Sequence, residues 1–133
     1  MYRINRLLTN ICSERLLESR EFYTKLFDFQ IDFESEWFIH LISHSLKLEL
    51  GIIDRKSQYI PECYQKSPVG VFITFVVDDS DTLYKIVKRE GYEIVEEPHD
   101  TFYGQSRFLI KDPNGMLIDI SSPIPIKQND EKE

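Results

Sequence analysis

The chain has 133 residues, 41% hydrophobic and 13% aromatic, which suffices for one core and excludes two independent domains. Its formal charge is -7 and its basic residues are scattered, which argues against a nucleic-acid or membrane surface and favours a neutral or cationic small ligand. Cys12 and Cys63 are too few for a disulfide framework, and neither an export leader nor a membrane-spanning apolar run is present. We therefore expect a cytoplasmic protein with no nucleic-acid or membrane partner.

The first half of the chain has the pattern β-α-β-β-β. Residues 6–12 form a short apolar run that predicts a strand, and Ser13 is placed to cap the helix predicted over residues 14–27, where apolar side chains recur at helical spacing. Polar breaks then separate three β-rich stretches, at residues 28–35, 37–43 and 46–53.

The same pattern returns after residues 55–69, a mostly polar stretch with two prolines that is typical of a linker. A strand is predicted at residues 70–79, and Asp79 or Ser80 is placed to cap a helix that Gly91 ends. Further strands are predicted at residues 92–98, 106–112 and 116–122, with a long loop over residues 96–105.

A supersecondary unit of about fifty residues that occurs twice indicates two halves that pack against each other. We predict an α+β fold with one domain over residues 1–133. Its parts are a first βαβββ module at 4–54, a linker at 55–69, a second module at 70–123 and a frayed tail at 124–133.

Strand alternation assigns two acids to the faces away from the helices. In the last strand of the first half, Glu49 lies opposite an apolar row of Leu46, Leu48, Leu50 and Ile52. In the last strand of the second half, Asp119 lies opposite Met116, Ile118 and Ile120. The turn before this strand, "DPNG", carries residues that favour a tight reversal.

The paired units, the helix end "SREFYTKLFDF", the "VVDD" before the second helix and "DPNGMLID" together resemble the vicinal oxygen chelate superfamily of glyoxalases, bleomycin-resistance proteins and extradiol dioxygenases. The resemblance covers roughly residues 4–123. It implies a cup-shaped mixed sheet with helices on its outer face, and a homodimer whose cavities lie between subunits. Whether the modules pair within one chain or by domain swapping stays open.

Metal-dependent members of that superfamily carry ligands at four equivalent strand positions, which correspond here to Leu8, Glu49, Phe72 and Asp119. Leucine and phenylalanine have no lone pair to donate, so only two ligand types are retained. Asn10, two residues beyond Leu8 on the same face, could add an amide oxygen. We therefore expect no metal site of the usual kind, with an atypical divalent metal site as the alternative.

The ligand pocket is predicted to contain nine residues: Leu8, Asn10, Trp37, His40, Glu49, Phe72, Thr74, Tyr103 and Asp119. His40 lies on a strand face where a hydrogen-bonded role is commoner than a ligand role, and His44 and His99 are expected in solvated breaks. Aromatic walls beside carboxylates suit a cationic or ring-bearing ligand, although most of these aromatics have core packing as their alternative role.

The leading functional hypothesis is a metal-independent small-molecule binding protein, similar to the bleomycin-resistance proteins that sequester an antibiotic. The alternative is a lyase, isomerase or dioxygenase in which Glu49 or Asp119 is a general base whose pKa is raised by desolvation. A third hypothesis is an interaction or accessory module. The sequence contains no G-x-S-x-G elbow, phosphate loop or dinucleotide-binding glycine motif.

Overall fold

The computed structural model describes residues 1–45 and 47–124, which form two compact units. Unit 1 contains residues 1–71 together with 112–116, and unit 2 contains residues 72–111 and 117–124 of the described chain. Leu46 and residues 125–133, which include nearly all of the expected tail, lie outside the described residues.

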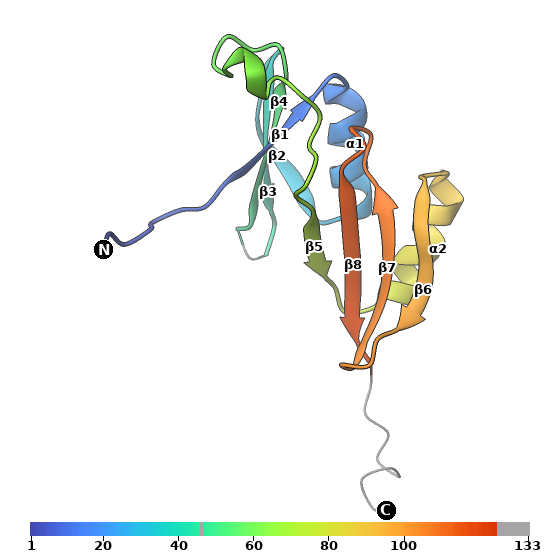
Figure 1. Ribbon diagram of the computed structural model, residues 1–133. Coiled ribbons are helices and arrows are strands. Elements are labelled where there is room, and N and C mark those ends of the chain that lie inside the picture. Colours follow the sequence, from blue (N-terminus) through green and yellow to red (C-terminus); the bar gives the residue numbers. More distant parts are fainter. Residues whose placement is uncertain (46, 125–133) are drawn as a thin grey trace, which may run out of the picture. The chain divides into compact units, whose positions relative to one another are not determined.

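Unit 1 is a four-stranded mixed sheet with one helix (Figure 1). Its elements are β1 (Thr9–Ser13), α1 (Leu16–Leu26), β2 (Phe29–Glu34), β3 (Phe38–Ser43) and β4 (Glu49–Asp54). The strand order is β1-β4-β3-β2, in which β1 runs parallel to β4 and the other neighbours are antiparallel. A short 3₁₀ helix, Glu62–Tyr64, interrupts the linker that follows.

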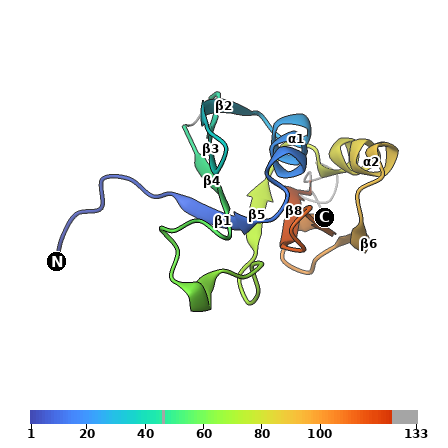
Figure 2. The same cartoon turned by 90° about the horizontal axis from the view of Figure 1, so that it is seen from above.

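Unit 2 repeats this topology. Its elements are β5 (Ile73–Val76), α2 (Ser80–Glu90), β6 (Ile94–Asp100), β7 (Gln105–Lys111) and β8 (Leu117–Pro123), with the strand order β5-β8-β7-β6. Both views place α2 on one side of its sheet (Figures 1 and 2). The α+β class and the two βαβββ modules predicted from the sequence are therefore confirmed.

Each module is stabilised by a helix that buries one face against its sheet. In α1 the buried positions are Ser19, Phe22, Tyr23 and Leu26, spaced three and four residues apart, and the sheet presents Ile39, Leu41, Leu50 and Ile52. Full burial of each large apolar side chain contributes about 1.5–3 kcal/mol. In the described part of the chain, neither 11-residue helix nor any other is long and apolar enough to cross a bilayer.

The second helix has the ends that the sequence predicts. Asp79 is its N-cap, and the Asp79 carboxylate accepts a hydrogen bond of 3.1 Å from the Thr82 amide. Gly91 ends the helix in the left-handed conformation, with φ of 79°.

The first helix begins later than predicted, and Ser13 is not its cap. Ser13 ends β1, and α1 starts at Leu16 with no side-chain cap on Arg15. The Ser13 hydroxyl instead accepts a hydrogen bond from the Arg15 amide (2.8 Å) and donates to the Asn114 side-chain oxygen (2.6 Å). The strand prediction was also too long, because residues 6–8 precede β1.

Two other boundaries differ from the predictions. β4 begins at Glu49, after Lys47 with a positive φ of 56°, and Leu48 is 55% exposed instead of packing under the helix. A loop was predicted over residues 96–105, but β6 extends into it as far as Asp100. His99 therefore pairs with Arg107 in the sheet. Register shifts in the β6–β7 pairing absorb the extra residues, as β-bulges do.

The "DPNG" turn does more than reverse the chain, because residues 112–116 pack with unit 1. The buried Tyr23 hydroxyl on α1 donates to the Asp112 carboxylate at 2.7 Å. Asp112 also accepts hydrogen bonds from the amides of Asn114 (2.8 Å) and Met116 (2.9 Å). The Asn114 side chain donates to Ser19 (3.0 Å), so the turn is bonded to α1 at two places.

Candidate functional site

Glu49, the first residue of β4, is the centre of a hydrogen-bonded cluster in unit 1. Its side chain is 11% exposed and lies on the sheet face away from the buried Leu50. The guanidinium of Arg6 donates from Nε to both carboxylate oxygens, at 2.9 and 2.7 Å, and Nη2 forms a further ion pair with Oε1. The cluster therefore contains a neutralised carboxylate.

His40 on β3 completes this cluster. The His40 ring is largely buried, with Nε2 2.7 Å from Glu49 Oε1 and Nδ1 2.8 Å from Asp32 Oδ2. A neutral imidazole has one N–H and donates to one of these carboxylates, whereas a doubly protonated ring donates to both. His40 thus has the hydrogen-bonded role that is commonest for such a strand position.

The electrostatics of the cluster oppose a general-base role for Glu49. The hydrogen bond from Arg6 lowers the pKa of the Glu49 carboxyl to about 2, and the hydrogen bond from His40 acts in the same direction against the effect of desolvation. Desolvation does act to raise this pKa, but the hydrogen bonds outweigh it, so the expectation of a raised pKa for Glu49 is wrong. An acid that is so readily ionised has little tendency to accept a proton near neutral pH.

Asp119 has an equivalent environment in unit 2. It lies within β8, is 7% exposed, and pairs across the backbone with Thr74 on β5 and Leu109 on β7. Its Oδ1 accepts a hydrogen bond from Arg107 Nε at 2.9 Å, and its Oδ2 accepts one from the Thr74 hydroxyl at 2.8 Å. Both carboxylate oxygens are therefore occupied, and the pKa of Arg107 is raised by the hydrogen bond to Asp119.

The two modules place a nitrogen-bearing side chain at the same position relative to the acid. Ile42 is opposite Glu49, and Leu109 is opposite Asp119. Two residues before these partners, on the same face of each third strand, are His40 and Arg107. A repeated arrangement of this kind indicates that the acid and its partner belong to the duplicated unit.

Arg6 and Arg107 are the residues that sequence reasoning missed. A signal for Arg107 was available, because alternation along β7 places it on the face of Leu109, next to Asp119. For Arg6 the signal was weaker, because it precedes β1 and lies 43 residues from Glu49 in the chain.

The donor set does not fit the metal centre that metal-dependent relatives carry. Leu8 and Phe72 offer no donor atom, and Glu49 and Asp119 are each engaged by an arginine. Among the described residues, no group of three or more His, Cys, Asp or Glu side chains could hold a metal ion.

Four of the nine predicted pocket residues form hydrogen-bonded pairs, His40 with Glu49 and Thr74 with Asp119. A fifth, Asn10, lies over Gly51, so close that a Cβ added at Gly51 would collide with the Asn10 side-chain oxygen. The other four are outside these hydrogen-bonded clusters: half-buried Leu8, and Trp37, Phe72 and Tyr103, which are 41%, 52% and 59% exposed. The Trp37 ring packs against the Tyr59 ring in a tilted arrangement, with ring centroids 5.1 Å apart.

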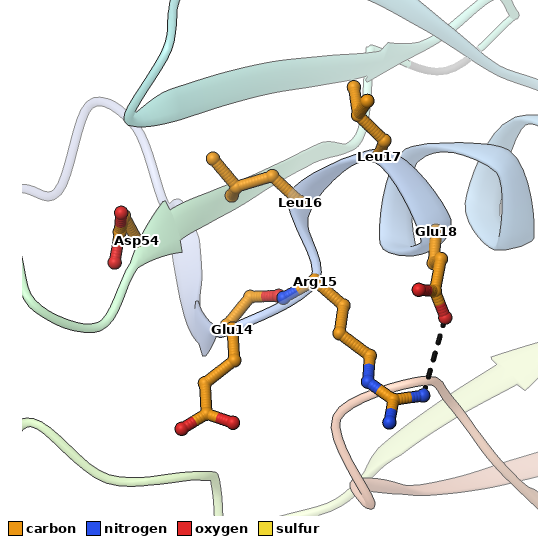
Figure 3. A pocket seen from close by; sticks show the side chains of 7 residues that line it. Glu14, Arg15, Leu16, Leu17, Glu18 and Asp54 are labelled. Carbon is orange, nitrogen blue, oxygen red and sulfur yellow. Dashed lines mark hydrogen bonds and ion pairs between the residues drawn. The ribbon is translucent and has the colours of Figure 1, made fainter.

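Several hollows lie along the described part of unit 1. One of about 300 Å³ lies at the start of α1, where Figure 3 shows the Arg15 guanidinium reaching toward Glu18. Arg15 pairs with Glu18 at 3.3 Å and Glu14 pairs with Arg55, while the Asp54 carboxylate accepts a hydrogen bond from the Lys56 amide at 2.9 Å. A second of about 460 Å³ lies beside Leu17 and Glu34, and a third of about 520 Å³ lies between β1 and the linker.

Comparison with solved structures supports the fold. A member of the glyoxalase/bleomycin resistance protein/dioxygenase superfamily from Sphaerobacter thermophilus is 18% identical, with a TM-score of 0.75, covering 90% of this chain and 98% of that one. A hypothetical protein from S. aureus is 22% identical, with a TM-score of 0.72 and coverages of 91% and 95%. A family enzyme from Burkholderia phytofirmans is 21% identical, with a TM-score of 0.71 and coverages of 88% and 97%.

Such low identities establish the fold alone, and the comparison with curated proteins found no match. The family comparison goes further, because the model described as "Glyoxalase/Bleomycin resistance protein/Dioxygenase superfamily" matches residues 3–120. That match spans both βαβββ modules and includes Arg6, His40, Glu49 and Arg107. The chain therefore belongs to the glyoxalase/bleomycin resistance protein/dioxygenase superfamily.

Proposed function

We propose that this protein binds a small organic molecule without the help of a metal ion. The observation that carries the proposal is that both acids, Glu49 and Asp119, are bonded to arginine. The other two positions at which the resemblance implies metal ligands carry Leu8 and Phe72. An acid that is neutralised within the protein is suited to fixing the shape and polarity of a cavity wall.

The neutralised acids also change the expected ligand. The sequence favoured a cationic or ring-bearing molecule because two acids were predicted to face the cavity. With Arg6 on Glu49 and Arg107 on Asp119, neither site carries an uncompensated negative charge. A positive charge is therefore no requirement for the ligand, and the proposal is limited to a small molecule.

The enzymatic alternative has no comparable support. A lyase, isomerase or dioxygenase that uses Glu49 as its base needs a carboxylate that takes up a proton near neutral pH, and the pKa of Glu49 is about 2. Asp119 accepts hydrogen bonds on both oxygens from Arg107 and Thr74. Neither acid has the environment of a poised base.

We further propose a homodimer, as the resemblance of the sequence to the superfamily implies. Ile31 and Phe33 on the edge strand β2 are 47% and 54% exposed, which supplies apolar area for an association. Light scattering should give twice the mass of the chain. A strictly monomeric protein would contradict this part of the proposal.

The binding function is tested by screening small molecules for an increase in melting temperature, with and without a chelator. A ligand that binds only the native state must stabilise it, so at least one compound should raise the melting temperature. The shift should be equal in EDTA and in added divalent metal. A shift that appears only with metal, or no shift from a broad collection, would contradict the proposal.

A further inference from the structure

The hollow between β1 and the linker is built in part by the segment that the sequence identified only as a linker. It measures about 520 Å³, within the range of roughly 300–1,000 Å³ that is usual for small-molecule pockets. Four consecutive residues of β1, from Thr9 to Cys12, line one side. Because β1 is an edge strand of the unit 1 sheet, the hollow runs along a strand edge that offers main-chain polar groups.

The linker wall is held in place by specific bonds. The Gln65 side chain donates hydrogen bonds to the backbone carbonyls of Ser57 (3.2 Å) and Ile60 (3.0 Å). The Gln65 backbone amide donates to the Glu62 carbonyl (3.1 Å). The Cys12 thiol lies 3.9 Å from the Tyr64 carbonyl oxygen, which ties the linker to β1. These contacts make the hollow a formed feature of unit 1.

The chemistry of the lining is apolar with a single charge. Its apolar members are Ile11, Tyr64, Pro68, Val69, Val71 and Met116. Lys66 is the one charged side chain among the described residues that line it, and no acid is among them. In a chain of net charge -7, a hollow that carries one cation and no anion is a local exception.

We propose that this hollow binds a small, mainly aromatic molecule that carries one negative charge. The apolar wall would take the body of the molecule, and the Lys66 ammonium would pair with its carboxylate or sulfonate. The inference rests on the proposed function, for which it names a site and a ligand class. It differs from the sequence-based expectation in the sign of the ligand's charge and shares only Asn10 with the predicted pocket.

A matched pair of fluorescent probes tests the charge requirement. 1-Anilinonaphthalene-8-sulfonate carries one negative charge, and N-phenyl-1-naphthylamine is the same ring system without the sulfonate. The wild-type protein should bind the anion more tightly than the neutral probe. In Lys66→Met the affinity for the anion should fall about tenfold while the neutral probe is unaffected, because the variant removes the cation that pairs with the sulfonate.

Lys56→Met is the control, because Lys56 is an exposed lysine of the same linker that does not line the hollow. Equal losses in the two variants would show a general effect of net charge and would overturn the proposal. Circular dichroism establishes that each variant is folded before its affinity is compared.

Cys63 supplies a second readout, since it is exposed and lines the hollow. In a Cys12→Ser background the anionic probe should slow the reaction of Cys63 with a maleimide, to a degree that saturates with probe concentration. Binding without protection of Cys63 would place the probe elsewhere and overturn the proposal. If the Cys63 thiol of a dimeric protein is already unreactive without probe, a second copy of the chain covers the hollow. That result would also overturn the proposal.

The outcomes separate this inference from the proposed function. Suppose that Lys66→Met leaves the affinity for the anionic probe unchanged and that the probe does not protect Cys63, while another compound raises the melting temperature in EDTA. The binding function is then supported, and the assignment of this site is wrong. If no compound raises the melting temperature, the binding function falls as well.

Discussion

At the scale of single residues, the decisive interactions are hydrogen bonds between charged groups far apart in the chain. Arg6 and Glu49 are 43 residues apart, and His40 lies between two carboxylates. The pKa of Glu49 is lowered because its charged form accepts bonds from Arg6 and His40. The effect on stability follows from the sign of this shift.

The first prediction concerns the pH dependence of stability. A carboxyl whose pKa falls from 4.5 to about 2 on folding stabilises the native state above pH 4.5, and that contribution is lost as the pH falls toward 2. The free energy of unfolding of wild type should therefore exceed that of Glu49→Gln at pH 6. The difference should shrink between pH 4.5 and pH 2 in urea titrations.

Glu36→Gln serves as the control for this experiment, because Glu36 is an exposed acid outside the cluster. Its stability difference from wild type should change little over the same pH interval. A Glu49→Gln difference that stays constant from pH 6 to pH 2 would contradict the ion pair with Arg6.

The second prediction concerns Tyr23, whose buried hydroxyl donates to Asp112 at 2.7 Å. Burial raises the pKa of Tyr23 well above its ordinary value, with the Asp112 charge acting in the same direction, so Tyr23 remains a donor. Tyr23→Phe should lower the free energy of unfolding by about 1–3 kcal/mol, because it removes the shorter of the two hydrogen bonds to a buried Asp112 oxygen, which keeps only the Asn114 side-chain amide at 3.2 Å. Tyr59→Phe, at a 68% exposed position, should have little effect in the same urea titration. Equal effects would refute the role assigned to this bond.

At the scale of elements, most predictions succeeded because apolar periodicity and capping residues are local signals. Asp79 and Gly91 end α2 as predicted, since a side-chain cap and a left-handed glycine require only neighbouring residues. The prediction that Ser13 caps α1 was wrong, because the Ser13 hydroxyl is hydrogen-bonded to Asn114, 101 residues away in the chain. β6 was predicted too short because bulged pairing with β7 carries a polar stretch into the sheet.

The third prediction concerns the end of α2. At Gly91 an added Cβ would meet no atom within 4 Å, so its substitution tests the backbone alone. Gly91→Ala should destabilise the protein by about 1 kcal/mol, the cost of placing an L-residue at φ of 79°. Gly91→Asn should cost less, because asparagine tolerates this conformation better. Thermal unfolding of the two variants measures the difference, and an alanine variant as stable as wild type would contradict the cap geometry.

At the scale of the whole molecule, the chain is a duplicated module in which the same strand position carries an acid. The duplication accounts for the equivalent partners of the two acids. Each partner lies two residues before the residue opposite the acid on the neighbouring strand, and it is His40 in one module and Arg107 in the other. In each module one of the two positions at which the resemblance implies a metal ligand carries an apolar residue, Leu8 in the first and Phe72 in the second. The acid of each module forms an ion pair with an arginine.

The fourth prediction concerns metal dependence. Because the donor set does not fit a metal centre, overnight dialysis against EDTA should leave the melting temperature and far-ultraviolet circular dichroism of the protein unchanged. Elemental analysis of protein purified without chelator should find less than one equivalent of zinc, nickel, iron or manganese. A stoichiometric metal whose removal lowers the melting temperature would contradict the interpretation of Glu49 and Asp119.

The sequence by itself determined the two modules, their element order and the faces of Glu49 and Asp119, because strand and helix periods are properties of neighbouring residues. Only the tertiary structure decided what those acids contact. Arg6 reaches Glu49 from a segment before β1, and the linker forms a hollow with β1 and Met116. Such partners depend on distances in space between residues far apart in the chain, and no local period encodes them.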